Sequence, residues 1–198
     1  MSLMGGLDAI VYAAGLSRLH RLANADLVAW QELYSINLFG AALLTRAALP
    51  HLLAEGSQGR AVYLSSDSAD LPYPGLVIYG TSKAALSAYT RGLASEFTSL
   101  RVTEVQVGPT AGTEVANHFD PELFDEWLPL WFEQGFVRFE MLQVDDVASM
   151  IIEALDATVP PARVMATGAE GGQTLEAATN AAPEDQPTVG SALYGGGQ

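Results

Sequence analysis

One tyrosine and one lysine stand four residues apart in the run from Tyr79 to Lys83. In a helix, this spacing places the phenol and the ammonium on the same face, one turn apart. A nearby ammonium stabilises a phenolate and lowers the phenol pKa, which suits a tyrosine for acid–base catalysis near neutral pH. Lys83 is also the only lysine of the chain, since the other cationic side chains are arginines. The alternative interpretation is an ordinary helix with an exposed lysine.

Two further polar side chains stand inside apolar segments. Residues 60–64 are typical of a buried strand, and this strand runs into Ser66, thirteen residues before Tyr79. Asn37 is an amide within a long apolar segment that is predicted to be helical. Each residue also has a structural interpretation: Ser66 as a strand-end cap, Asn37 as a buried amide satisfied by backbone carbonyls, and Tyr79 as a packing aromatic. Considered together, the three residues and Lys83 favour a catalytic site.

In order and spacing, these residues resemble the short-chain dehydrogenase/reductase family over Leu7 to Leu155. The matching positions are the family's Asn-Asn-Ala-Gly motif (here Tyr12-Ala13-Ala14-Gly15), the helix asparagine Asn37, the strand-end serine Ser66, and the pair Tyr79 and Lys83. The resemblance implies an NAD(P)-dependent oxidoreductase that interconverts a hydroxyl and a carbonyl group on a small apolar substrate.

The resemblance also implies a role for each residue. Tyr79 is the acid/base, and Ser66 hydrogen-bonds the substrate oxygen. Lys83 lowers the Tyr79 pKa and holds the nicotinamide ribose, while Asn37 holds a water for proton relay. The expected cofactor is NAD or NADP. Its expected contacts are Ala13, Ala14, Gly15, Tyr79 and Lys83, with Gly108 and Thr113 from a segment that resembles the family's Pro-Gly-x-x-x-Thr sequence.

The family's first strand, glycine-rich turn and helix have no counterpart before Asp8. The glycines of that turn let the backbone approach the cofactor pyrophosphate at a helix N-terminus. Another glycine turn, Gly168 to Gly172, follows a predicted strand at 163–166 and precedes a segment that could form a helix at 173–182. It is an alternative phosphate site in a permuted arrangement. The other interpretation is a last strand followed by a loose tail.

Strands and helices alternate along the chain, which predicts a parallel sheet with helices on its faces. We expect an α/β fold, a partial Rossmann-like doubly wound parallel sheet with flanking helices, over residues 1–167, and a flexible acidic tail over 168–198. The predicted helices span about 25–54, with Asn24 as N-cap and a bend at Pro50, and about 76–98. The predicted strands lie near 8–13, 60–64, 101–107 and 163–166.

Composition excludes several classes of function. The chain has 198 residues, enough for one domain with a core. Its net charge of −14 argues against binding of nucleic acid or an anionic membrane. The absence of cysteine excludes disulfides, and His20, His51 and His118 lack metal-ligand spacing, so no metal site is expected. No apolar run of membrane-span length and no signal peptide is recognised, and a cytoplasmic location is predicted.

Partners and alternatives remain open on sequence grounds. We expect a small-molecule substrate, and the resemblance implies a homodimer or homotetramer through the two long helices. An alternative is a truncated, catalytically silent member that serves as an interaction or structural module, or a fragment of a longer enzyme. A segment rich in aromatic residues suits a lid over a bulky apolar substrate, simple packing, or an oligomer contact. Its aromatic residues are Phe119, Phe124, Trp127, Trp131, Phe132, Phe136 and Phe139.

Overall fold

The computed structural model describes residues 6–137 and 141–166 of the chain. Its main sheet has four parallel strands in the order β1-β2-β3-β6. These strands are β1 (Ala9–Tyr12), β2 (Arg60–Ser66), β3 (Arg101–Val107) and β6 (Arg163–Ala166). Two short strands, β4 (Thr110–Ala111) and β5 (Leu142–Gln143), form a second parallel pair. The predicted parallel α/β fold is confirmed, and the predicted strand at 60–64 continues to Ser66.

Helices connect the strands in the order that parallel pairing requires. The α-helices are α1 (Leu27–Tyr34), α2 (Ala41–Leu52), α3 (Val77–Glu96), α4 (Pro121–Glu133) and α5 (Val144–Asp156). A short π-helical segment, η2 (Ser35–Gly40), joins α1 to α2 and is hereafter the π-turn. The other short elements are the 3₁₀ helices η1 (Leu22–Asn24), η3 (Asp67–Ala69) and η4 (Val115–His118). The helix predicted at about 76–98 therefore spans Val77–Glu96. The proposed tail, and the proposed glycine turn at 168–172, lie outside the described residues.

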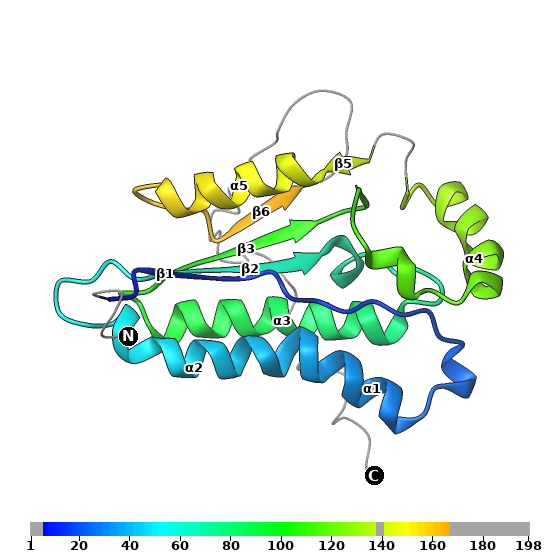
Figure 1. Cartoon of the computed structure of the whole chain (residues 1–198), viewed down its shortest axis with the longest axis horizontal. Coiled ribbons are helices and arrows are strands. Elements are labelled where there is room, and N and C mark those ends of the chain that lie inside the picture. Colours follow the sequence, from blue (N-terminus) through cyan, green and yellow to red (C-terminus); the bar gives the residue numbers. More distant parts are fainter. Residues whose placement is uncertain (1–5, 138–140, 167–198) are drawn as a thin grey trace, which may run out of the picture.

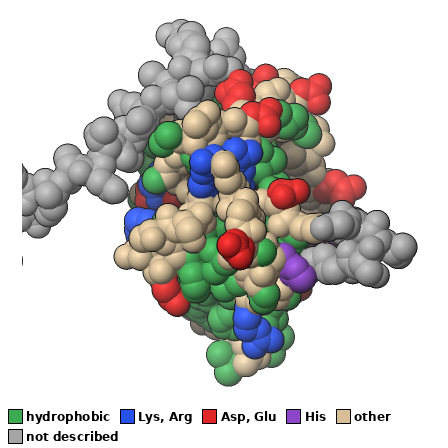
Figure 2. Space-filling model, turned by 90° about the vertical axis from the view of Figure 1, so that its left-hand side faces the viewer, with side chains coloured by type: hydrophobic (Ala, Val, Ile, Leu, Met, Phe, Trp, Pro, Cys, Tyr) green, Lys and Arg blue, Asp and Glu red, His purple; other side chains and the backbone are tan. Residues whose placement is uncertain are grey.

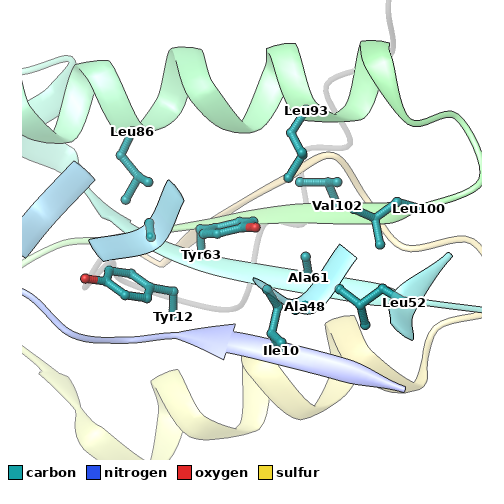
Figure 3. Packing of buried hydrophobic residues seen from close by; sticks show 11 residues of the cluster. Ile10, Tyr12, Ala48, Leu52, Ala61, Tyr63, Leu86, Leu93, Leu100 and Val102 are labelled. Atoms are coloured by element: carbon teal, nitrogen blue, oxygen red, sulfur yellow. The ribbon is translucent and has the colours of Figure 1, made fainter. Parts of the chain in front are cut away.

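The helices cover the two faces of the sheet unequally. Helices α2 and α3 lie on one face, and α5 lies on the other, over β3 and β6 (Figure 1). Side chains of β2 alternate between these layers, as the pleat of a strand demands. Tyr63 is completely buried toward α2, where its hydroxyl lies 2.6 Å from that of Thr45 (Figure 3). Val62 packs on the opposite side with Val105 and Ala154.

The first long helix begins later than its sequence predicts. Asp26, not Asn24, is the N-cap of α1, because the Asp26 carboxylate accepts a hydrogen bond from the Ala29 amide at 3.0 Å. The helical path then runs through η2 into α2 and ends at Leu52, two residues after Pro50. Asn24 instead ends the short turn η1. An aspartate or asparagine serves equally well as an N-cap, so composition alone could not decide between them.

The same helical path is apolar over much of its length. By length and composition alone, Leu27–Leu52 is long and apolar enough to cross a membrane, which the sequence interpretation did not recognise. Core helices of soluble proteins pass the same test. Here one side of the path packs on the sheet and on α3, with Leu33, Ala41 and Ala48 buried.

The candidate residues lie at one end of the sheet. The end at which the strands begin carries arginines and acidic side chains among hydrophobic ones, without segregation of charge (Figure 2). The strands point toward the opposite end, where the residues singled out from the sequence follow β1, β2 and β3. In open parallel sheets, ligands bind outside the carboxyl ends of the strands. The fold therefore places the candidate residues at the end where a site is expected.

Candidate active site

Ser66 ends strand β2 and caps the turn that follows it. Its backbone is extended, and its hydroxyl oxygen accepts hydrogen bonds from the amide and the hydroxyl of Ser68, at 3.2 and 2.9 Å. The same hydroxyl donates to the Asp67 carboxylate at 3.1 Å. Ser66 is buried, so its orientation is set by these partners rather than by water.

Tyr79 and Lys83 lie one turn apart on α3 and meet at the end of β2. The Lys83 ammonium lies 5.8 Å from the centre of the Tyr79 ring and donates to the Leu64 carbonyl oxygen at 3.0 Å. Tyr79 is partly buried, and its phenol lies near the Ser66 hydroxyl. The structure thus brings the tyrosine, the lysine and the serine together, as their spacing predicts.

The electrostatics of the pair differ from the sequence expectation. Burial raises the pKa of Tyr79 to about 12; the nearby Ser66 hydroxyl only partly opposes this rise, and the Asp67 charge adds to it. Burial also lowers the pKa of Lys83 to about 8. The expected lowering of the Tyr79 pKa toward neutrality by Lys83 is therefore wrong for this structure. Both side chains are taken out of water, and desolvation penalises the phenolate and the ammonium alike.

Asn37 reaches this group of residues from the π-turn η2. Its amide nitrogen donates to the Leu16 carbonyl and to the Ser82 hydroxyl, both at 2.9 Å, and its oxygen accepts from the Leu16 amide at 2.8 Å. Asn37 is fully buried. Such wide turns within helices are frequent at functional sites because they redirect one side chain. This one ties the segment after β1 to helix α3.

Gly15 stands where β1 meets the other candidate residues. A Cβ at Gly15 would lie 3.2 Å from the Lys83 ammonium and 3.7 Å from the Asn37 side-chain oxygen. Ala13 and Ala14, just before it, are exposed. A glycine therefore fits this close approach without displacing the end of the Lys83 side chain.

The predicted contacts after β3 are more loosely connected to the others. Gly108 is buried, and its amide donates to the Ala166 carbonyl at 2.8 Å. Thr113 is exposed, and its hydroxyl turns back to the Thr110 carbonyl at 3.2 Å. Gly108 thus sits beside β6, at the carboxyl end of the sheet. Among the described residues, the Thr113 side chain makes no hydrogen bond to the group around Tyr79.

A tyrosine that sequence reasoning missed supports the π-turn. The Tyr12 hydroxyl donates to the Ile36 carbonyl at 2.5 Å, and it fills the space that a Cβ at Gly40 would need. Burial raises the pKa of this phenol. Tyr12 occupies the first position of the Asn-Asn-Ala-Gly match, so its departure from asparagine was the available signal.

Asp67 and Tyr73 were also missed. The Tyr73 hydroxyl lies 2.8 Å from the Asp67 carboxylate and 2.8 Å from the Phe136 carbonyl. Burial raises the pKa of Asp67 and that of Tyr73. An acidic residue directly after an apolar strand and a serine was a visible signal for Asp67. The partnership with Tyr73 depends on the folding of the loop, which no local pattern reveals.

Helix α4 packs beside this site through aromatic side chains. Trp127 and Trp131 are buried with Tyr73, and Tyr79 is partly buried against the same cluster. The Trp131 indole donates to the Pro74 carbonyl at 3.0 Å. Of the aromatic residues that the sequence assigned to a lid, Phe139 lies outside the described residues. The others belong to 119–136, where Phe119, Phe124 and Phe136 make ring contacts within the cluster.

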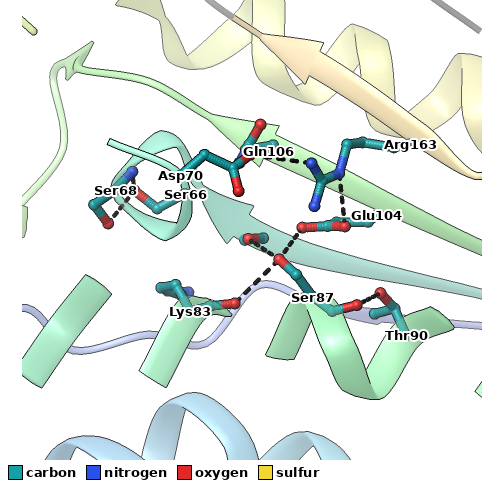
Figure 4. Close-up of polar contacts among 10 residues, drawn as sticks. Ser66, Ser68, Asp70, Lys83, Ser87, Thr90, Glu104, Gln106 and Arg163 are labelled. Atoms are coloured by element: carbon teal, nitrogen blue, oxygen red, sulfur yellow. Dashed lines mark hydrogen bonds and ion pairs between the residues drawn. The ribbon is translucent and has the colours of Figure 1, made fainter. Parts of the chain in front are cut away.

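A buried polar network supports α3 from behind (Figure 4). Glu104 of β3 is 2% exposed, accepts from Arg163 at 2.9 Å and hydrogen-bonds with Ser87 of α3. Arg163 also reaches Asp70 in the loop after β2, at 3.1 Å. Because a buried charge needs partners, this network fixes α3 and that loop relative to the sheet.

Within residues 6–137 and 141–166, no group of three or more histidines and acidic residues is arranged to hold a metal ion. In the same ranges, no helix opens on the glycine-rich turn Gly-x-x-x-Gly-x-Gly. The alternative glycine turn at 168–172 lies beyond the described part of the chain.

Comparison with known proteins places this geometry in context. A family model described as short chain dehydrogenase matches residues 1–123. A probable NADP-dependent dehydrogenase of Haemophilus influenzae is 30% identical over 152 residues, which are 74% of this chain and 57% of that protein. An NADP-dependent 3-hydroxy acid dehydrogenase of Escherichia coli is 30% identical over 114 residues, 56% of this chain and 46% of that protein. The chain thus spans about half the length of these relatives.

Solved structures agree with the fold. A short-chain dehydrogenase from Streptomyces avermitilis is 26% identical, with a TM-score of 0.69 over 84% of this chain and 63% of the other. A short chain dehydrogenase from Mycobacterium paratuberculosis, solved with NAD bound, has a TM-score of 0.70 at 20% identity, over 84% of this chain and 65% of the other. At that identity the second likeness concerns the fold alone.

Proposed function

Because this chain belongs to the short-chain dehydrogenase family, we propose that it is an NAD(P)-dependent oxidoreductase that interconverts a hydroxyl and a carbonyl group. One observation carries the proposal. Ser66, Tyr79 and Lys83 come from two elements and lie together at the carboxyl end of β2, and Asn37 of a third element joins helix α3 through Ser82. The names of two relatives include NADP dependence, which supports the choice of cofactor class.

The proton chemistry follows from the phenol. With a pKa raised to about 12, Tyr79 holds its proton at neutral pH. It is therefore prepared to donate that proton to a carbonyl oxygen as the oxygen gains negative charge. Ser66 lies near the same phenol, and its hydroxyl would stabilise the developing charge on that oxygen when it donates to it. In this state, the phenol can serve as the acid in reduction of a carbonyl compound.

The residues fit the nicotinamide end of a dinucleotide. The absent side chain of Gly15 leaves room beside the Lys83 ammonium, and Lys83 is the cation placed to bind ribose hydroxyls. A bound nicotinamide nucleotide supplies the hydride, while this chain's own residues position the substrate oxygen and transfer the proton. Gly108, at the end of β3, is the proposed contact for the nicotinamide amide.

The substrate side of the site points to an apolar compound. Tyr79 contacts the aromatic cluster that Trp127, Trp131 and Tyr73 form between α4 and the loop after β2. Aromatic walls of this kind bind apolar groups and exclude water from the reacting atoms. A small apolar ketone or aldehyde is therefore the proposed class of substrate.

Titration of the whole chain with NADH and NADPH, followed by nucleotide fluorescence, tests the proposal. We expect saturable binding at micromolar concentration and turnover of apolar carbonyl compounds. Tyr79→Phe removes the proton donor and should lower kcat by about 10²- to 10⁴-fold while leaving nucleotide binding intact. Failure to bind either nucleotide up to millimolar concentration would contradict the proposed activity.

Tyr34→Phe is the matched control for this substitution. Tyr34 lies on α1, where its ring contacts those of Trp30 and Phe39. Tyr34→Phe removes the same atom as Tyr79→Phe, but Tyr34 has no part in the site. The kcat of the Tyr34→Phe variant should equal that of the wild type. A similar loss of kcat in both variants would point to a general effect on folding.

A second candidate function rests on the apolar helices. Leu27, Val28, Phe39 and Leu43 expose large hydrophobic side chains along α1, η2 and α2. Exposed apolar surface of this kind marks protein–protein contacts. We propose that this surface joins copies of the chain into a homodimer or homotetramer. If nucleotide binding fails, it also favours the alternative of a catalytically silent interaction module.

A further inference from the structure

The Ser66 hydroxyl has no hydrogen left to offer a substrate. A hydroxyl carries one donor hydrogen and two acceptor positions. The hydrogen is directed to Asp67 Oδ1 at 3.1 Å, and the oxygen accepts from the Ser68 amide and from the Ser68 hydroxyl. A substrate oxygen that needs this hydrogen must therefore compete with a carboxylate, which is a stronger acceptor than a neutral carbonyl.

The carboxylate itself is held in place from its other side. Asp67 Oδ2 accepts from the Tyr73 hydroxyl at 2.8 Å, and that hydroxyl also lies 2.8 Å from the Phe136 carbonyl, just after α4. Asp67 is 9% exposed, so water offers it little alternative hydrogen bonding. The contacts run from the end of α4 through Tyr73 and Asp67 to Ser66. The packing of the loop therefore keeps the Asp67 carboxylate in place to compete with a substrate oxygen for the Ser66 hydrogen.

We propose that Asp67 is a positioning residue that holds the Ser66 hydroxyl hydrogen away from the substrate while its carboxyl group is ionised, and that releases it on protonation. This inference rests on the proposed oxidoreductase function for its consequence in turnover. The hydrogen-bond switch itself is a property of the protein without any ligand. Asp67 does not touch the reacting atoms; it acts through Ser66, and its charge also raises the pKa of Tyr79.

The surroundings of Asp67 place this switch at an accessible pH. Burial raises its pKa above the ordinary value of about 3.9, and hydrogen bonds from Tyr73, Ser66 and the Ser68 backbone oppose that rise. Two titratable side chains face the group: Tyr73 from its own loop and Tyr79 from α3. The segment after α4 presents a backbone carbonyl, which carries no net charge. As the pH falls through the Asp67 pKa, Ser66 is released.

Tyrosine labelled with ¹³C at Cζ provides a test that needs no activity. The Tyr79 signal, assigned by its loss in Tyr79→Phe, reports whether the released Ser66 hydroxyl turns to donate to the phenol oxygen. Between about pH 3 and about pH 8 we expect one step in this signal, centred above the ordinary range of an aspartic acid. Asp67→Asn should abolish the step. The matched control Asp70→Asn changes a carboxylate three residues later, which binds Arg163 and Gln106 rather than Ser66, and should retain it.

Ser66→Ala separates the hydroxyl from the charge. If the step is transmitted by reorientation of the Ser66 hydroxyl, it should shrink strongly in Ser66→Ala. A step of full size in that variant, an unchanged step in Asp67→Asn, or a flat wild-type signal would each overturn the proposal. Wild type, Asp70→Asn and Ser66→Ala suffice for this decision even if Asp67→Asn does not fold.

Turnover gives a second readout. In the wild type, kcat/KM for carbonyl reduction should fall as the pH rises through the Asp67 pKa, and Asp67→Asn should lack this fall. At about pH 8 the variant should be about fivefold more active, since an amide oxygen holds the serine hydrogen less strongly than a carboxylate. A wild type that shows the spectroscopic step without any turnover would refute the proposed function and leave the switch standing. A kcat/KM profile identical in wild type and variant would refute the switch.

Discussion

Lys83 occupies a position in which its ammonium is costly to keep charged. Its side chain is 5% exposed, and its one described acceptor is the Leu64 carbonyl. Burial lowers its pKa to about 8, well below the usual value for a lysine. The unfolded chain therefore binds a proton that the folded chain has given up over the range between about 8 and about 10.

We expect the free energy of unfolding to rise with pH over that range because of Lys83. Stability rises wherever the unfolded state binds more protons, and the gain should be about 2 kcal/mol between about pH 8 and about pH 10. Lys83→Met lacks the titrating group and should lose this increment. Urea unfolding of both proteins at several pH values measures the difference. Parallel pH curves for the two proteins would show that the lysine is not desolvated.

At the residue scale, the sequence predicts which side chains meet but not how they are charged. Spacing alone suffices to bring Tyr79, Lys83 and Ser66 together, because one helix and one strand end position all three. The raised pKa of Tyr79 depends on burial by α4 and the loop after β2, which are distant in sequence. The Asp67 switch likewise requires Tyr73 to fold back onto it.

Helix α4 is held against the site by a glycine. Gly75 has φ of +83°, and a Cβ added there would overlap the ring of Trp127. The Gly75 carbonyl also accepts from the His20 amide at 3.0 Å. The Trp127 ring therefore packs directly on the backbone of the loop before α3. Only a glycine at position 75 leaves room for the ring.

Gly75→Ala should displace α4 from the site. We expect faster hydrogen–deuterium exchange over residues 121–137 and a higher KM for an apolar substrate, since the aromatic wall is no longer seated. Gly56→Ala is the matched control: Gly56 has φ of +77°, but a Cβ there meets nothing within 4 Å. It should cost only the backbone strain of about 1 kcal/mol and leave α4 unaffected. Equal exchange over 121–137 in both variants would contradict the role given to Gly75.

At the element scale, alternation of strands and helices is predictable because the periods of apolar residues differ between the two. The strands after Asp8, before Ser66 and before Gly108 are found where they are predicted. The π-turn at Ser35–Gly40 is not predictable, since no proline or other local signal marks it. Its hydrogen-bond partners lie earlier in the chain: Tyr12 donates to Ile36 of the turn, and Asn37 of the turn donates to Leu16.

For the molecule as a whole, one face of the first long helical path remains apolar. Leu43 on α2 is 56% exposed, and Phe39 in η2 is 51% exposed. The chain carries a net charge of −14, so copies repel one another at long range and need apolar contact to associate. The sequence predicts these helices, but only the packing of the helices on the sheet determines which of their faces points outward.

Leu43→Glu should weaken self-association. We expect the wild type to sediment as a dimer or tetramer and the variant to shift toward the monomer, because the new charge would be buried in the contact. Ile152→Glu is the matched control, since Ile152 on α5 is 57% exposed on the other face of the sheet. Analytical ultracentrifugation distinguishes the two. A wild type that is monomeric throughout, or an equal shift in both variants, would refute association through α2.

The close approach of the Tyr12 hydroxyl to Gly40 has a consequence for descent. A Cβ at position 40 and a tyrosine ring at position 12 cannot share the same space. We expect a side chain at position 40 to be tolerated once position 12 has been shortened, and to displace the tyrosine ring or the π-turn where it has not. The two sites therefore constrain the order of their own substitutions and form one heritable unit, although they lie 28 positions apart in the chain.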